Sequence, residues 1–260
     1  VAPNTKMQPV PGNVLRIAGA GIADATSVVD FSTINNTVEW NGGNQTIVNP
    51  NGISDNSGYY KLILSGSGTK TMPTTDMSIS DELKLDGTVS VTAQSSLTIG
   101  GEFEILDNAS FSTGNYDHTV GGDLDNRGTF TASSGTVITL NGSSVQDIYG
   151  GAPTAFEELV IDNPAGVDII TPISISDTLV LSNGNLNIGA TNLYINGAIT
   201  KTSGYLNTSP QSSMTFGGTS ALTLDSNIFY AEPIIDTLSV NRTGGLAINR
   251  DITVNGQLNL

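Results

Sequence analysis

The chain has 260 residues, of which 13% are charged, and its 24 acidic and 9 basic residues give a net charge of −15. Phosphate recognition needs clustered Lys and Arg, so this balance argues against nucleic acids and anionic membrane surfaces as partners. The lack of cysteine excludes disulfides and thiolate sites, and no apolar run approaches the ~20 residues of a membrane-spanning helix. We therefore expect no nucleic-acid partner and no direct membrane insertion.

The first 36 residues are less regular than the remainder and predict an N-terminal cap or partial coil around LRIAGAGI at Leu15–Ile22. Residues 37–260 carry repeats. The chain begins with Val-Ala-Pro instead of an initiator Met, and it stops at Leu260 on a repeat strand. Because a repeat array normally ends in a polar cap, we expect the chain to be a fragment of a longer protein.

A short motif returns along the chain at a spacing typical of a β-solenoid. The octapeptide SISDELKL at Ser78–Leu85 returns as SISDTLVL at Ser174–Leu181 and as TVNGQLNL at Thr253–Leu260, with looser copies between them. Each copy reads as a short strand, a small polar corner and another short strand. This pattern predicts an all-β fold, a parallel β-helix (β-solenoid) with about 20 residues per coil and roughly ten to twelve coils.

Alternation within the octapeptide assigns its side chains to the inside or the outside of the coil. The residues predicted to point inward are Ile79, Leu83 and Leu85, those predicted to point outward are Glu82 and Lys84, and the corner is Ser80-Asp81. Ile79, Ile99 and Val120 are 20 and 21 residues apart, so successive coils should stack them in one internal ladder.

A longer period of 80–97 residues divides the repeats into approximate modules at 37–136, 137–213 and 214–260. Each module opens with an apolar residue and a polar turn, which is followed by a strand, an irregular turn and a second strand. The opening turns are Trp40-Asn41-Gly42, Leu140-Asn141-Gly142 and Phe216-Gly217-Gly218. Trp40 should lie in the core, because Leu140 and Phe216 share its repeat position.

Three stretches rich in Pro, Gly and Asn do not fit the coil and are predicted as longer corner loops: Asn49–Tyr59, Ile148–Phe156 and Asp225–Pro233. Exposed loops carry recognition, so their aromatic residues are the candidate contacts for a glycan or protein ligand. These candidates are Tyr59, Tyr149, Phe229 and Tyr230. Packing of the same rings within the loops is the alternative.

His118 is the only histidine, and any metal or catalytic site that needs histidine must use it. It lies one residue before the predicted strand at Thr119-Val120, where an exposed polar residue is expected. We therefore assign it no catalytic role.

Acidic residues recur at one outward position of the coil. Glu82, Glu102 and Asp123 share a repeat position, and the neighbouring ladder stacks Lys84 against Glu104, with Asp125 next. Like charges ~5 Å apart repel by roughly 3 kcal/mol at an effective dielectric constant of 20. Full solvation, ion pairing by Lys84 or a bound Ca²⁺ would each relieve this repulsion, and the candidate metal ligands are Glu82, Glu102, Asp123 and Asp125. Paired carboxylates also suit a retaining glycosidase, but no Arg cluster or aromatic platform lies nearby to hold a sugar.

The segments Val29–Phe31, Trp40–Thr46, Leu64–Met72 and Gly114–Ile148 carry a family resemblance. Together they resemble the β-solenoid repeats of large cell-surface and secreted, adhesin-like proteins of Bacteroidetes. This resemblance covers residues 29–260 and implies an extracellular or bacterial cell-surface location. It also implies O-glycosylation at Asp-Thr-Leu sites, for which Thr178 and Thr237 are the candidates.

The sequence therefore favours a non-catalytic structural or adhesive stalk segment of a large exported bacterial surface protein. Its partners would be the flanking repeats and modules of the same polypeptide, and surface glycans or proteins. The first alternative is a glycan- or protein-binding module that uses the corner loops, and the second is a polysaccharide-cleaving parallel β-helix enzyme. We predict no cofactor, with Ca²⁺ as the alternative.

Overall fold

The computed structural model describes residues 10–20, 31–50 and 58–260. Within these residues every regular secondary-structure element is a β-strand. None of the described segments is a helix of the length and apolarity that crossing a membrane requires. Parallel strands from successive turns stack as a β-solenoid of about 11 turns with about 21 residues per turn. The predicted fold class is confirmed.

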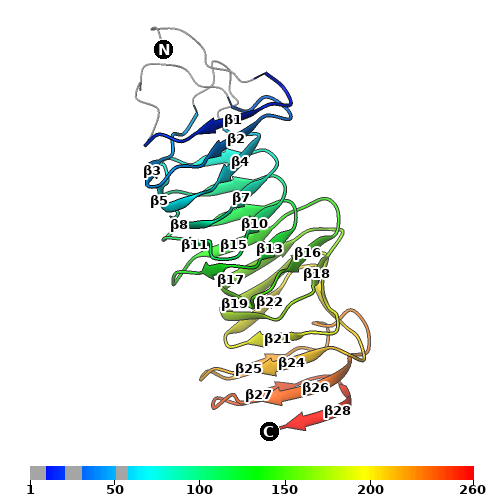
Figure 1. Cartoon of the computed structure of the whole chain (residues 1–260). Helices are drawn as coiled ribbons and strands as arrows, with labels where there is room; N and C mark the ends of the chain where they lie inside the picture. The colour runs from blue at the N-terminus through cyan, green and yellow to red at the C-terminus, as the bar shows by residue number, and fades with distance from the viewer. Residues whose placement is uncertain (1–9, 21–30, 51–57) are drawn as a thin grey trace. The chain divides into compact units, whose positions relative to one another are not determined.

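Contacts divide the chain into two compact units, residues 1–121 with 125–133 and residues 122–124 with 134–260. In the first unit three parallel sheets form the walls of the solenoid (Figure 1). The first sheet contains β1 (Val14–Ile17), β2 (Thr37–Trp40), β4 (Lys61–Leu64), β7 (Leu83–Leu85) and β10 (Phe103–Ile105). The second contains β3 (Gln45–Thr46), β5 (Ser67–Thr71), β8 (Thr88–Thr92), β11 (Ser110–Ser112) and β14 (Thr129–Thr131). The third contains β6 (Met77–Ile79), β9 (Leu97–Ile99) and β12 (His118–Val120), while β13 (Leu124–Asn126) falls at the division.

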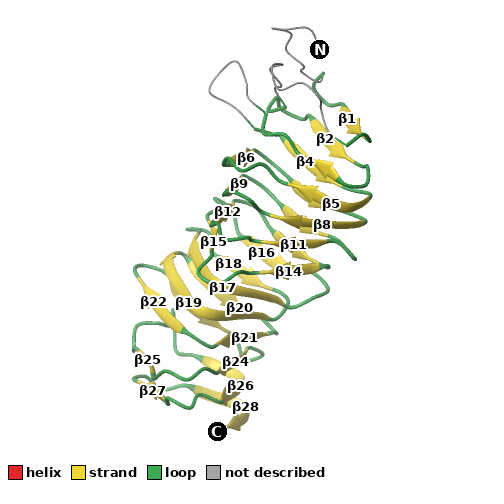
Figure 2. Cartoon of the chain, turned by 90° about the vertical axis from the view of Figure 1, so that its left-hand side faces the viewer, coloured by secondary structure: helices red, strands yellow, loops and turns green. Residues whose placement is uncertain are grey.

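The second unit is built in the same way but contains longer strands. One sheet contains β16 (Gln146–Tyr149), β18 (Val167–Ile169), β20 (Asn185–Ile188) and β23 (Tyr205–Thr208). Another contains β15 (Val137–Leu140), β17 (Thr154–Asp162), β19 (Ile173–Asn183), β21 (Asn192–Ile195), β24 (Ser213–Phe216), β26 (Ile234–Val240) and β28 (Thr253–Asn259). Two shorter pairings complete it: β22 (Ala198–Lys201) lies beside β19, and β25 (Leu222–Leu224) lies beside β27 (Leu246–Ile248) (Figure 2).

The core consists of equivalent apolar side chains stacked from one coil to the next. Ile79 pairs with Ile99, and Ile99 pairs with Val120, as the sequence predicts. Leu83 likewise lies in register with Phe103, and each of these side chains is at most 2% exposed. Burial of one such side chain stabilises the fold by roughly 1.5–3 kcal/mol, so the ladders supply most of the driving force for folding.

Glycine is required where the first sheet turns into the second. Gly66 and Gly87 occupy the same corner of successive coils and have φ angles of +84° and +77°. A side chain on Gly87 would also collide with the coil below, because its Cβ would lie 2.4 Å from the Gly66 carbonyl oxygen. Any other residue would therefore strain the backbone and separate the coils.

The repeated SISD motif takes two conformations. In the first unit Ser80-Asp81 forms the predicted corner between β6 and β7. In the second unit the chain continues through Ser176-Asp177 as one strand, β19, with a register shift against β17. The neighbouring strand explains the difference. β17 is unbroken beside Ser176-Asp177, so β19 stays paired with it on both sides of this dipeptide, and its one extra residue forms a β-bulge.

The Asn-Gly turn and the glutamine that follows it form a hydrogen-bonded clamp between coils. The Gln45 amide accepts from the Gly42 N–H (3.0 Å) and donates to the carbonyls of Ile17 (2.7 Å) and Gly19 (2.6 Å) on the preceding coil. From the following coil, the buried Lys70 Nζ donates to the Gln45 side chain (2.6 Å) and to the carbonyls of Gly42 and Gly43. We call this arrangement, a turn whose carbonyls are held by a side chain of the next coil, a corner clamp.

Each of the other two predicted modules contains a corner clamp. Gln146 accepts from the Gly142 N–H (2.8 Å), and the Asn163 amide donates to Gln146 (2.9 Å) and to the Ser144 carbonyl (2.7 Å). In the last module Arg242 donates to the carbonyls of four residues of two preceding corners: Asn196, Gly197, Gly217 and Ser220. Asn163 follows β17 and Arg242 follows β26, and the two residues occupy the same position of the longer repeat. The clamp residue at this position therefore differs in chemistry between modules.

Replacement of Lys70 tests the corner clamp. Lys70→Met keeps the aliphatic stem but removes the ammonium group, so the Gln45 side chain and the carbonyls of Gly42 and Gly43 lose a charged hydrogen-bond donor. We expect the free energy of unfolding, measured by urea denaturation, to fall by roughly 2–4 kcal/mol. Lys201→Met is the matched control and should change it by less than about 1 kcal/mol, because the Lys201 ammonium contributes a cation–π contact with the Tyr205 ring rather than hydrogen bonds to a turn. Equal losses in the two variants would contradict the clamp.

Removal of a whole coil tests the register of the ladders. Leu85 pairs with Ile105, so deletion of residues 86–105 lets Leu106 follow Leu85 and brings β11 beside β5 with its inward residues unchanged. This variant should keep a β-rich circular dichroism spectrum and a cooperative thermal transition. Deletion of residues 86–95 removes half a coil and should abolish the transition. Similar melting of the two variants would show that coil register does not matter.

Candidate functional site

Two lysines of the first unit form ion pairs with acidic residues on or beside the predicted acidic ladder. Lys61 lies in register with Glu82 and forms ion pairs with Glu82 (2.8 Å) and Asp81 (3.3 Å). The hydrogen bond that the Lys61 ammonium donates to the Glu82 carboxylate raises the pKa of Lys61. Lys84 pairs with Glu104 at 2.5 Å on the adjacent ladder, as the sequence predicts. Glu102 occupies the next position after Glu82 and is half-buried.

Asp123 and Asp125 have different roles in the structure. Asp123 is half-buried, and its Oδ1 accepts from the Asp147 N–H at 2.8 Å. Asp125 is fully buried and paired with the Arg127 guanidinium, with Nε at 3.1 Å from Oδ1 and Nη2 at 2.6 Å from Oδ2. Among the residues that the structure describes, no group of three or more His, Cys, Asp and Glu side chains could hold a metal ion. The Ca²⁺ alternative therefore remains a prediction without a ligand set in this region.

The loop aromatics differ from one another in exposure. Tyr59 is fully buried, its ring stacks on Phe31 at 5.4 Å between centroids, and its hydroxyl donates to the Val48 carbonyl at 2.7 Å. Burial raises the pKa of this phenol. Phe229 is 3% exposed, and its backbone forms a parallel β-bridge with Leu206. The rings of Tyr59 and Phe229 therefore lie in the core rather than at the predicted loop surface. Part of the first loop, residues 51–57, lies outside the described residues.

Tyr149 and Tyr230 are the accessible members of the set. Tyr149 ends β16 and is half-buried, and the predicted loop at Ile148–Phe156 is shortened because both of its ends belong to strands. Tyr230 is 64% exposed and packs edge-to-face on Tyr205, with ring centroids 5.9 Å apart. Tyr230, in the loop at Asp225–Pro233, is therefore the exposed aromatic residue among the four candidates.

The two candidate O-glycosylation threonines lie within strands. Thr178 is half-buried in β19, between Glu158 of β17 and Ala198 of β22. Thr237 is half-buried in β26, and its hydroxyl donates to the Asp236 carboxylate at 2.9 Å. Their modification remains a prediction from the family resemblance.

His118 is buried, so the exposed position predicted for it from the sequence is wrong. It is 3% exposed within β12, where its Nδ1 accepts from the Leu97 N–H (3.1 Å) and its Nε2 lies 3.0 Å from the Thr113 carbonyl. This pairing requires a neutral ring with the proton on Nε2. Burial lowers the pKa of His118, although the Thr113 hydrogen bond opposes the shift. The alternation of the strand places the residue two before Val120 on the inside, and that signal was available in the sequence.

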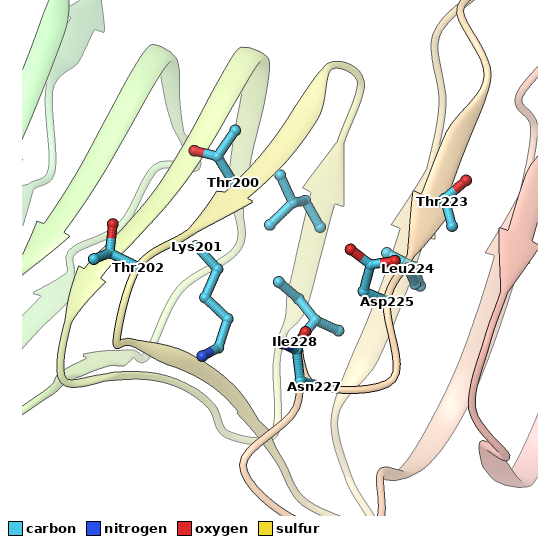
Figure 3. A pocket seen from close by; sticks show the side chains of 9 residues that line it. Thr200, Lys201, Thr202, Thr223, Leu224, Asp225, Asn227 and Ile228 are labelled. Atoms are coloured by element: carbon cyan, nitrogen blue, oxygen red, sulfur yellow. The ribbon is translucent and has the colours of Figure 1, made fainter.

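The candidate site of the second unit is a cavity where one wall of the solenoid opens. β21 and β24 are paired, but after the next corner β22 pairs with β19 and β25 pairs with β27, with no pairing between β22 and β25. A cavity of about 230 Å³ lies in this gap. Its polar lining consists of Thr200, Lys201, Thr202, Thr223, Asp225 and Asn227 (Figure 3).

Two arginines hold the walls of this gap. Arg242 joins the corner that precedes β22 to the corner that precedes β25 through its four carbonyl contacts. Arg250 donates to the Ser226 carbonyl (3.0 Å) and pairs with Glu232 (3.0 Å), so it fixes the two ends of the loop at Asp225–Pro233. Side-chain hydrogen bonds from Arg242 and Arg250 thus hold the two sides of the gap, where β22 and β25 form no strand pairing.

Lys201 differs from the other basic residues of the described chain. Arg16, Lys61, Lys84, Arg127 and Arg250 form ion pairs with carboxylates. Lys70 and Arg242 are buried, and both donate to backbone carbonyls. The Lys201 ammonium instead lies over the Tyr205 ring, 3.8 Å from its centroid, and lines the cavity. A cation with an aromatic partner, beside an open polar cavity, is available to a ligand.

A comparison of the chain with protein-family models, curated proteins and solved structures finds no match. The sequence predicts Tyr230 and the loop at Asp225–Pro233 as candidates, but it does not indicate Lys201 or Tyr205. The two residues lie in strand-like segments, and no sequence pattern shows that β22 lacks a neighbour on one side.

The buried neutral His118 predicts a specific dependence of stability on pH. Its pKa is lowered on folding, so below about 6.5, the ordinary histidine value, the unfolded chain binds the proton more strongly and stability falls. Titrating carboxylates add their own dependence, which comparison with His118→Gln removes. The difference in unfolding free energy between wild type and variant should shrink from pH 7.5 to pH 5, by up to ~1.4 kcal/mol per unit. A difference that is constant over this range would refute the neutral buried ring.

Proposed function

We propose that the chain is a non-catalytic structural, adhesive stalk segment of a large exported bacterial surface protein. The observation that carries this proposal is the regular stacking of equivalent buried side chains, coil after coil, in each unit. A fold in which each coil contacts its neighbours supports load and spacing through the whole stack rather than shaping one central cleft. The partners in this proposal are flanking repeats and modules of the same polypeptide.

The charged residues of the first unit support a structural role over a catalytic one. Glu82 and Glu104 are engaged by Lys61 and Lys84, so these carboxylates stabilise neighbouring coils. Lys70 is engaged in its corner clamp. A glycosidase would instead need a carboxylate pair facing a sugar, one of them held protonated. The described carboxylates of the first unit therefore do not favour the polysaccharide-cleaving alternative.

The surface location tests the proposal directly. Antibodies raised against the folded chain should label intact, unpermeabilised cells of its source, and external protease should remove the signal. A cytoplasmic protein of the same cells serves as the control and should be labelled after lysis alone. If this chain is labelled only in lysed cells and not in intact cells, the export proposal is contradicted.

A glycan- or protein-binding module is the second candidate function. It is favoured by the exposed Tyr230 and by the polar cavity beside the loop at Asp225–Pro233. This function is compatible with a stalk, because a site on one wall of a solenoid leaves the coil stacking unchanged. It requires no cofactor.

A further inference from the structure

We propose that the cavity between β22 and β25 binds one acidic sugar residue of a glycan, with the carboxylate of the sugar held by Lys201. This inference rests on the second candidate function and is independent of the stalk role. Its starting point is the chemistry of the lining, since ligands are recognised by the groups that converge on a cavity.

The charge of the cavity selects an anionic group. In a chain with a net charge of −15, seven of the eight basic residues that the structure describes already hold carboxylates or backbone carbonyls. Lys201 is the exception, and its contact with Tyr205 holds the ammonium in place without neutralising it. A carboxylate in the cavity would give this ammonium a charge-assisted hydrogen bond.

The rest of the lining suits the hydroxyl groups of a sugar. Three threonine hydroxyls and the Asn227 amide can both donate and accept, and the Asp225 carboxylate accepts. Figure 3 shows Lys201 on one side of the cavity and Asp225 with Asn227 on the other. No ion pair within 4 Å joins Lys201 and Asp225, so a ligand between them can use both. An acidic sugar carries a carboxylate that can accept from Lys201 and hydroxyl groups that can donate to Asp225.

Size and surroundings limit the ligand to one residue with an extension. A volume of about 230 Å³ is below the ~300–1,000 Å³ of pockets for drug-sized molecules, which indicates a single ring. Tyr205 and Tyr230 pack edge-to-face beside Lys201, and the exposed Tyr230 offers a face for the apolar side of a neighbouring sugar. The contacts of Arg242 and Arg250 hold both walls before any ligand arrives, which reduces the entropy cost of binding.

Matched sugars and matched variants test the inference. The probes are the methyl glycosides of glucuronic acid and galacturonic acid, with those of glucose and galactose as neutral counterparts of the same rings. Binding to the whole chain is measured by ligand-observed and protein-observed NMR. At least one acidic glycoside should bind about tenfold more tightly than its neutral counterpart, because one charge-assisted contact distinguishes them.

The variants assign the effect to residues. Lys201→Met should remove the preference for the acidic glycoside, and Lys201→Arg should restore it to within about threefold. Tyr230→Ala should weaken binding several-fold, whereas Tyr116→Ala, at an exposed tyrosine of the first unit, should leave it unchanged. Thermal melting of every variant confirms that the fold is intact.

The possible outcomes separate the two levels of the proposal. Neutral and acidic glycosides that bind equally, with loss in Tyr230→Ala but not in Lys201→Met, would overturn the acidic selectivity while leaving a binding module. Failure of all four glycosides to bind at 50 mM, or binding unaffected by every substitution, would overturn the site itself. Neither result would bear on the stalk proposal.

Discussion

The structure depends on the burial of like side chains on top of each other in successive coils. Ile79, Ile99 and Val120 are in register, and so are Leu83 and Phe103, so each coil completes the core of the one beside it. A single coil of about 21 residues could not bury enough apolar area to offset its loss of conformational entropy. Stability therefore belongs to the interface between coils, and the short strands and tight corners follow from keeping every coil in register.

Buried polar groups add specificity to this apolar stack. The corner clamps at Gln45 and Lys70, at Gln146 and Asn163, and at Arg242 donate side-chain hydrogen bonds to turn carbonyls of preceding coils. A clamp residue positioned one coil off would lose these hydrogen bonds and leave its own buried polar group unpaired, which costs more than a satisfied hydrogen bond gains. The clamps thus oppose register slips that the repetitive aliphatic pattern alone would permit. In the second unit the same chemistry holds open the gap between β22 and β25.

Much of the fold could be predicted from the sequence, because a period of about 20 residues and strict alternation leave few other architectures. The inward positions, the Lys84–Glu104 pair and the buried Trp40 follow from that period. His118, Tyr59 and Phe229 were assigned to the surface by their polarity or loop context, but inward-facing places in the coil bury them. The bulged passage through Ser176-Asp177 depends on the neighbouring strand, which a motif cannot reveal. The cavity at Lys201 depends on an absent strand pairing, for which the sequence holds no local signal.

Crosslinking between coils tests the stacking most directly, because the chain contains no cysteine of its own. Ser78 and Thr98 are exposed and lie in register on adjacent coils, 20 residues apart, whereas Ser78 and Ser90 are 12 residues apart but lie on different sheets. The double variant Ser78→Cys/Thr98→Cys should form an intramolecular disulfide under mild oxidation, since adjacent parallel strands bring Cα atoms within the required ~4.4–6.8 Å. The variant Ser78→Cys/Ser90→Cys should remain reduced under the same conditions. Faster crosslinking of the pair that is closer in sequence would contradict the coil stacking on which the fold, the clamps and the cavity depend.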